Sequence, residues 1–335
     1  MKILITGQAE EEVFPFNNSG PWELFKQEII KHGHEVSEKG FIEKADAVIA
    51  NSIDKRLLEY MKKTNIPINR RALIVWEPFV VSQKSYKTEN LKQFGHVFAP
   101  SVCWSSRLNA IPFKWPQDVV SHDKTHQNWS KRQSKIVVIQ GNKFSAVQGE
   151  MYSTRRRAFK ALGTNKLTLY GTNWNKGFIY DAQKWLQSAL RTPIKNLSLR
   201  SAEGIGFKYK NYQGSITKKS DVLQEFRFAL VVENSLDYVS EKLFDAVRAG
   251  CIVIYVGPDL SLFDLPENVA IEISPSISQI KQIFLNLLNL SENDQLSIAR
   301  KQLDALISVS KSWQNTSILP NLASDILTCF SNNSD

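Results

Sequence analysis

Residues 233–242 place a carboxylate, an aromatic ring and a cation within one short polar turn. The turn, ENSLDYVSEK, follows the apolar run at residues 228–232 and leads into a helical pattern. Lys242 falls in the opening turn of that helix, where the helix dipole disfavours a cation by roughly 0.3–1 kcal/mol. A bound anion would offset this cost, and helix amides with Tyr238 and Lys242 could hold a diphosphate. Glu241 could then accept hydrogen bonds from sugar or ribose hydroxyls.

An ordinary capped helix explains the same turn without any ligand. Ser240 or Asp237 would cap the helix, Glu241 would suit its first turn, and Lys242 would extend into solvent. Pattern alone favours neither interpretation.

Two other positions carry charge that chemistry could use. Arg155, Arg156 and Arg157 form a basic run, which is typical of a solvated helix face. Glu77 follows the apolar segment 72–76, and a carboxylate at a strand end is most often a solvated loop residue. These charges alone do not define a site.

No metal-binding pattern stands out in the sequence. No Asp-x-Asp motif follows a predicted strand, and Cys103, Cys251 and Cys329 have neither metal-ligand nor disulfide spacing. We therefore expect no metal requirement and no cofactor. A diphosphate would have to be held by basic side chains and a helix dipole.

Alternating strands and helices must position these residues. The alternation predicts parallel sheets with helices on both faces. Ligands of such sheets bind beyond the carboxyl ends of the strands, where Glu77, Asn142 and the 233–242 turn would lie. The clearest predicted helices are residues 150–162 and 240–249. The clearest predicted strands are residues 2–6, 45–50, 72–76, 135–139, 167–171, 226–232 and 251–256.

The chain length of 335 residues predicts two domains. Periodicity is weak between about residues 112 and 135, which places the junction there and gives domains 1–130 and 131–335. The second domain would include the helical residues after Ile277. Residues 178–220 are predicted to be irregular, with one amphipathic piece near 185–190.

Composition is that of a globular protein, with 42% hydrophobic and 22% charged residues and a net charge of +9. No apolar run reaches the roughly 20 residues that span a bilayer, and no signal-peptide pattern opens the sequence, so we expect a cytoplasmic protein. The basic charge suits an anionic small ligand and also peripheral contact with an anionic membrane at its inner face. No nucleic-acid-binding motif is present, and the oligomeric state is not indicated.

Three segments together resemble the donor motif of the α1,3/1,4-fucosyltransferases, glycosyltransferase family 10. They are FRFALVVENS at 226–235, DYVSEKL at 237–243 and GCIVIYVGP at 250–258. Arg227, Val232 and Ser240 replace the Lys, Phe and Thr that are usual in the family, and Ile252-Val253 stands where Val-Pro is usual. The similarity covers about thirty residues of this chain.

The resemblance implies an α/β GT-B architecture, with two Rossmann-like doubly wound domains facing across a cleft. GDP-fucose would be held by the C-terminal domain. Lys242 and Tyr238 would contact the diphosphate, and Glu241 the hydroxyls of ribose or fucose. Asn234 would also be a donor-site residue. The family has an arginine seven residues before a leucine on the first helix of its donor domain, as Arg155 and Leu162 stand here, so the resemblance implies that Arg155 would neutralise charge on the departing GDP.

The resemblance also implies that Glu77 is the catalytic base. The family has Glu-Ser-Pro or Glu-Asn-x-x-Pro at this point, whereas this chain has Glu77-Pro78 directly. The expected activity is inverting, metal-independent fucosyl transfer from GDP-fucose to an oligosaccharide or a lipid-linked glycan, as in lipopolysaccharide synthesis. A different nucleotide sugar remains an alternative, as does a non-catalytic relative that binds a glycan or a nucleotide.

Overall fold

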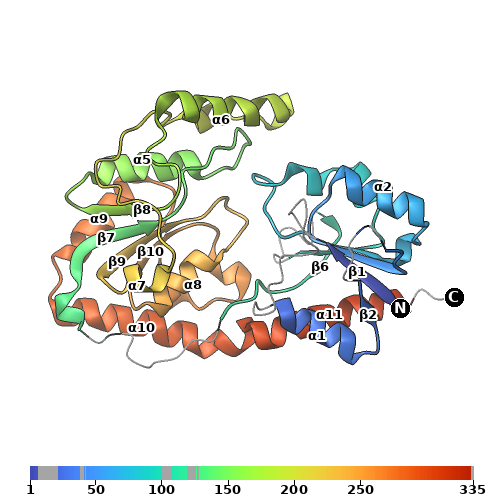
Figure 1. Cartoon of the computed structure of the whole chain (residues 1–335). Coiled ribbons are helices and arrows are strands. Elements are labelled where there is room, and N and C mark those ends of the chain that lie inside the picture. Colours follow the sequence, from blue (N-terminus) through green and yellow to red (C-terminus); the bar gives the residue numbers. More distant parts are fainter. Residues whose placement is uncertain are drawn as a thin grey trace. The chain divides into compact units, whose positions relative to one another are not determined.

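The computed structural model describes residues 1–6, 22–37, 41, 43–99, 108–118, 126 and 128–332. The chain divides into two compact units, one made of Met1–Val119 with Lys311–Asp335 and the other of Val120–Ser310. Figure 1 shows the strands and helices of both. Among the described residues, no helix is long and apolar enough to cross a membrane.

The described part of the N-terminal unit forms a six-stranded sheet in the order β2-β1-β3-β4-β5-β6, in which all neighbours are parallel. Parallel neighbours require crossovers, and helices supply several of them. The strands are β1 (Lys2–Thr6), β2 (Glu35–Val36), β3 (Ala47–Ala50), β4 (Arg71–Ile74), β5 (His96–Ala99) and β6 (Ile111–Pro112), and the helices are α1 (Trp22–Lys31), α2 (Lys55–Thr64) and α3 (Thr88–Leu91).

The last helix of the chain, α11 (Asn315–Ser331), belongs to this same unit. Its apolar face joins the core formed by β1, β3 and α1, and it lies beside α1 in Figure 1. The buried residues that α11 contributes are Leu319, Leu322, Ala323, Ile326, Leu327 and Phe330. The structure therefore differs from the predicted division at residue 130, because α11 completes the core of the first unit rather than that of the second.

The C-terminal unit contains a five-stranded parallel sheet in the order β11-β10-β9-β7-β8. All residues of β9 and β10 are buried, as expected for central strands covered on both faces. The strands are β7 (Gln133–Ile139), β8 (Leu167–Tyr170), β9 (Phe226–Val232), β10 (Ile252–Val256) and β11 (Ile271–Glu272), and the helices are α5 (Tyr152–Leu162), α6 (Gly177–Arg191), α7 (Lys219–Leu223), α8 (Glu241–Arg248), α9 (Ile277–Leu288) and α10 (Glu292–Ser310).

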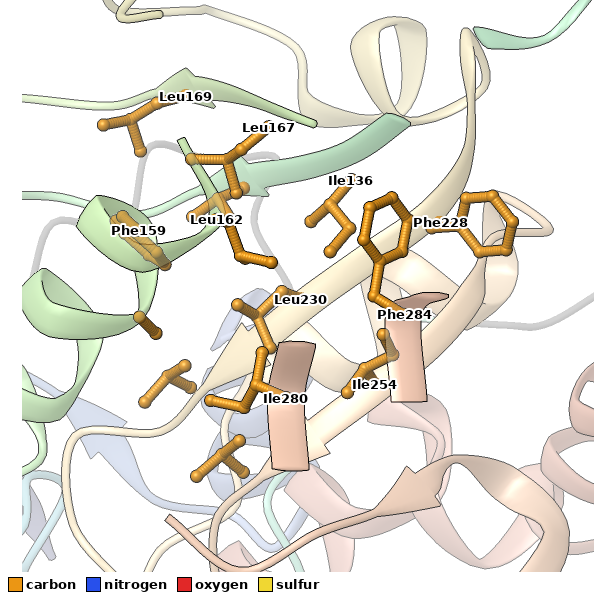
Figure 2. Close-up of a cluster of buried hydrophobic side chains, with 14 of the residues drawn as sticks. Ile136, Phe159, Leu162, Leu167, Leu169, Phe228, Leu230, Ile254, Ile280 and Phe284 are labelled. Atoms are coloured by element: carbon orange, nitrogen blue, oxygen red, sulfur yellow. The ribbon is translucent and has the colours of Figure 1, made fainter. Parts of the chain in front are cut away.

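Helices α5 and α9 bury one face of this sheet (Figure 2). Phe159 and Leu162 come from α5. Phe284 of α9 packs against Phe228 of β9, with their ring centroids 5.4 Å apart. This packing fixes α5 against the sheet, and α5 carries Arg155.

The strands are predicted well, but the region 178–220 is not. The structure has a 15-residue helix, α6, at Gly177–Arg191, where only a short amphipathic piece is predicted. Several of its apolar side chains are exposed, so its pattern differs from that of a helix that buries one apolar face. The prediction therefore missed most of this helix.

Candidate functional site

The C-terminal sheet has a topological switch point between β7 and β9. The chain runs from β7 to β8 on one side and then returns to place β9 on the other side of β7. In doubly wound sheets, ligands bind beyond the carboxyl ends of the strands at such a point. Here these ends lead into Gln140 and Gly141 after β7 and into Glu233 and Asn234 after β9.

Arg155 lies at this switch point and links its two sides. One guanidinium nitrogen, Nη2, donates to the Val232 carbonyl oxygen at 2.7 Å and to Asn234 Oδ1 at 3.2 Å. The other, Nη1, donates to the Gly141 carbonyl oxygen at 3.3 Å. The structure thus brings together two of the residues proposed from sequence, Arg155 and Asn234, at the edge where a ligand is expected.

The charge of Arg155 has no carboxylate in contact with it. The side chain is only 2% exposed, and no described Asp or Glu oxygen lies within ion-pair distance of it. Burial lowers the pKa of Arg155, against the opposing effect of Tyr152, Glu233 and more distant carboxylates. A buried cation is usually paired, because desolvation is costly. An anion bound at the switch point would therefore find an unpaired positive charge within the site.

Arg156 is also buried, but it faces a different part of the unit. Its guanidinium donates to the carbonyl oxygens of Lys143, Ser201 and Glu203 at 2.7–2.9 Å and stacks over the ring of Phe144. The interpretation of Arg156 as a surface charge is wrong, because the side chain is 1% exposed. It ties the loop after β7 to the 199–206 segment.

Arg157 is the partly exposed member of the run. Its Nε lies 2.8 Å from Glu203 Oε2. Helical geometry explains the difference among the three arginines, since successive residues point about 100° apart around the helix. Sequence alone gave no way to choose Arg155, apart from the family resemblance.

Lys242 forms an ion pair with Glu233, a residue that was not predicted to be its partner. Glu233 is fully buried, and its carboxylate accepts from Ser240 N at 2.9 Å, Ser240 Oγ at 2.7 Å and Lys242 Nζ at 3.4 Å. Lys242 Nζ also donates to Ser240 Oγ at 2.6 Å. The unfavourable position of Lys242 at the start of α8 is therefore offset by a carboxylate of the protein itself.

Ser240 is the N-terminal cap of α8, as one of the two interpretations of this turn predicts. Its hydroxyl oxygen accepts from Lys242 N, and its backbone is extended, as is usual at a cap. The sequence analysis did not single out Glu233, although its position directly after an apolar strand, where a carboxylate needs partners, could have indicated it. Which partners it has depends on the path of the turn, which the sequence does not specify.

Glu241 is held by a second lysine. Its Oε1 lies 3.1 Å from Lys219 Nζ, which also lies 2.9 Å from Asp245 Oδ2. Burial alone would raise the pKa of Glu241, but Lys242 and Lys219 outweigh it and lower the pKa to about 2. Glu241 is therefore a stable hydrogen-bond acceptor, which suits hydroxyl groups rather than phosphate.

Tyr238 lies between these groups in the sequence but is buried, with 4% of its surface exposed. It sits in the turn between β9 and α8. The structure places it beside the other residues of the 233–242 turn, while its contact with a diphosphate stays a prediction.

Glu77 belongs to the N-terminal unit, whereas the other predicted site residues belong to the C-terminal unit. It lies three residues beyond β4 and is half-buried, and its carbonyl oxygen accepts from the Tyr86 hydroxyl at 3.1 Å. The preceding residue, Trp76, packs against Trp22 and Trp115 with centroid distances of 4.6 and 4.0 Å. Glu77 is thus anchored at the carboxyl edge of its own sheet.

The side chains that the structure describes include no cluster of three or more His, Cys, Asp or Glu suited to a metal ion. Arg155 and Arg156 are both buried without an ion pair to a described carboxylate, and Arg155 is the one that lies at the switch point.

Comparison with known proteins gives information on the fold. No protein-family model matches the chain, and no curated protein sequence matches it. Among solved structures, Anabaena Alr3699/HepE in complex with UDP and glucose is 12% identical, with a TM-score of 0.58 over 98% of this chain and all of the other. An α1,3-fucosyltransferase is 13% identical, with a TM-score of 0.58 over 100% of this chain and 90% of the other.

A third similar structure is the trehalose 6-phosphate synthase of Burkholderia multivorans, at 10% identity and a TM-score of 0.51. It is matched over 86% of this chain and 72% of its own. Identities this low establish a shared architecture and leave activity open. The chain has two parallel-sheet α/β domains of the Rossmann-like kind, and its fold is that of the GT-B glycosyltransferases.

Proposed function

We propose that this protein is a glycosyltransferase that takes its sugar from a nucleoside diphosphate donor bound at the β7/β9 switch point. The observation that carries this proposal is the buried Arg155, which lies at the ligand-binding edge without a carboxylate partner. A diphosphate supplies the missing negative charge, and guanidinium groups bind two phosphate oxygens well. The fold agrees with this assignment, since UDP is bound in a structural neighbour.

GDP-fucose is the donor that the sequence favours. The support is the motif at residues 226–258, because structural similarity does not distinguish guanine from uracil donors. In this proposal Asn234 fixes the guanidinium of Arg155, and Glu241 accepts hydrogen bonds from ribose or fucose hydroxyls. Lys242 retains one N–H after donating to Glu233 and Ser240, and it can direct that proton to a phosphate oxygen, with Tyr238 beside it.

The proposed reaction is a single displacement that inverts the anomeric centre. The acceptor hydroxyl oxygen attacks the anomeric carbon, the bond from that carbon to the phosphate oxygen breaks, and GDP leaves with the electron pair. Glu77 takes the proton of the attacking hydroxyl as general base. Arg155 offsets the charge that develops on the departing diphosphate, without a metal ion.

A donor panel tests this function directly. The purified protein is incubated with GDP-fucose, GDP-mannose, UDP-glucose and UDP-N-acetylglucosamine, with a mixture of oligosaccharide acceptors and with a chelator present. Release of GDP from GDP-fucose alone supports the full proposal, and release of UDP instead would change the donor while keeping the enzyme class. Nucleotide binding without turnover of any donor would indicate a non-catalytic relative, consistent with the altered Glu77-Pro78 sequence.

A further inference from the structure

Helix α6 and the segment after it expose an unusual amount of apolar surface. The exposed side chains lie within residues 178–199, whereas the one fully buried residue of α6 is polar, Asp181. Large exposed apolar residues at contiguous positions usually mark an interaction surface. Their exposed fractions are 66% for Phe178, 81% for Ile179, 52% for Leu186, 79% for Leu190, 91% for Ile194 and 73% for Leu199.

Three of the four members that lie in α6 form one stripe. Ile179, Leu186 and Leu190 are separated by seven and four residues, which places them within about 40° of one another around a helix of 3.6 residues per turn. The inner side of α6 is fixed by polar contacts, since Asp181 accepts from Asn142 Nδ2 at 3.2 Å and from Gly206 N at 3.0 Å. In Figure 1, α6 lies at the edge of its unit, beyond α5. The stripe therefore faces away from the core of the unit.

The exposed charged side chains within residues 176–200 are all positive. Lys176, Lys184, Arg191 and Lys195 are exposed, and none of them forms an ion pair with a described carboxylate. Arg200, at the end of the segment, is also exposed and pairs with Glu203 beyond it. Asp181 is the one acidic residue between 176 and 200, and it is buried. Long basic side chains can extend alongside a buried apolar stripe and keep their charges at a polar surface.

We propose that the 176–200 segment docks on the surface of an anionic lipid bilayer. An apolar stripe flanked by cations is the pattern of helices that lie in the membrane interface, with the apolar face inserted and the cations among the headgroups. Residues 176–200 expose no acidic side chain, which favours this occupant over a protein partner, whose interface would be expected to offer both signs of charge. The proposal does not depend on the transferase assignment, and its failure would leave that assignment standing.

Co-sedimentation of the full-length protein with vesicles tests the docking surface. We expect binding to vesicles of phosphatidylcholine with about one third phosphatidylglycerol, weaker binding to phosphatidylcholine alone, and loss of binding in high salt. The double variant Leu186→Gln/Leu190→Gln should bind roughly tenfold more weakly or worse. The affinity of Lys184→Gln/Arg191→Gln for the anionic vesicles should be roughly ten- to thirtyfold lower, since each cation contributes about fivefold.

A matched control comes from exposed leucines elsewhere in the same unit. Leu262 and Leu290 are 52% and 38% exposed and lie outside the 176–200 segment. Leu262→Gln/Leu290→Gln should bind anionic vesicles as the unaltered protein does. The proposal would be overturned if the unaltered protein did not bind the vesicles, or if the stripe variant, Leu186→Gln/Leu190→Gln, bound them as tightly as the unaltered protein. A dimer in sedimentation velocity that the stripe variant abolishes, without vesicle binding, would show instead that the stripe joins two copies of this chain.

Discussion

Replacing Lys242 by methionine tests whether this lysine stabilises the fold before any ligand binds. Glu233 is fully buried and Lys242 retains 16% of its side-chain surface, so solvent screens their interaction little. Breaking a buried ion pair costs about 3–5 kcal/mol when the remaining charge has no other partner. Ser240 N and Oγ still donate to Glu233 in the variant, so we expect a smaller loss in the free energy of unfolding, about 1.5–3 kcal/mol.

Urea denaturation of the full chain measures this loss, with Lys219→Met as the control. The ion pairs of Lys219 with Glu241 and Asp245 are partly exposed, so its loss should cost no more than about 1 kcal/mol. The double variant Glu233→Gln/Lys242→Met should recover most of the stability, because it leaves no buried charge unpaired.

The same variant also separates the two effects that Lys242 has on stability. Removing its charge leaves the buried Glu233 carboxylate with Ser240 as its remaining hydrogen-bond partner in this turn, and it also relieves the unfavourable position of a cation at the start of α8. Unchanged or increased stability at neutral pH would refute the reasoning, because relief of the helix dipole would then be the larger effect of the substitution.

Three further predictions concern other parts of the molecule. Glu77→Gln should retain nucleotide binding, since the donor residues belong to the other unit, but should lower transfer by roughly 10²–10⁴-fold, measured as product formation per enzyme; near-normal turnover would remove Glu77 from the mechanism. Ile326→Ala in α11 should destabilise the N-terminal unit by about 2–5 kcal/mol in chemical denaturation, because this fully buried side chain fills its core; a loss below about 1 kcal/mol would show that α11 is dispensable there. Lys242 and Lys219 lower the pKa of Glu241 to about 2, so the ionised carboxylate stabilises the folded protein above the usual glutamate pKa, and this stabilisation is lost as the pH falls toward 2. Lys219→Met should raise the pKa of Glu241, measured by NMR titration of its carboxyl carbon, and an unchanged value would contradict the pairing.

Local patterns predicted the strands well because the strands of this fold are short apolar runs. Residues 2–6 and 226–232 are strands in the structure with those bounds. Ligands of parallel sheets bind beyond the carboxyl ends of the strands, and this rule singled out the 233–242 turn, which includes Asn234. In the structure this turn follows the carboxyl end of β9. The positions of the strands and the ends at which their loops lie can be predicted from local sequence, without knowing which distant segments pack together.

Predictions that depend on partners far along the chain were less successful. The apolar pattern of α11 shows that the helix is buried, but it does not show which sheet covers it, and α11 returns to the first unit. Arg155 and Arg156 look equivalent in sequence, and only the packing of α5 sends one to the switch point and the other to the 199–206 segment. The pairing of Lys242 with Glu233 likewise depends on how the turn folds back.

Calorimetric titration with GDP, compared between Arg155→Lys and Arg156→Lys, tests the central claim most directly. Both arginines are buried on the same helix and donate to backbone carbonyl oxygens, so the two substitutions disturb folding in comparable ways. Lysine keeps the charge but cannot make the paired contacts of a guanidinium. If a diphosphate binds at the switch point, the unaltered protein and Arg156→Lys should bind GDP with similar affinity without metal, and Arg155→Lys should bind about ten- to hundredfold more weakly. Equal affinity in all three folded proteins, or no binding of GDP, UDP or ADP by any of them, would contradict the assignment of this site.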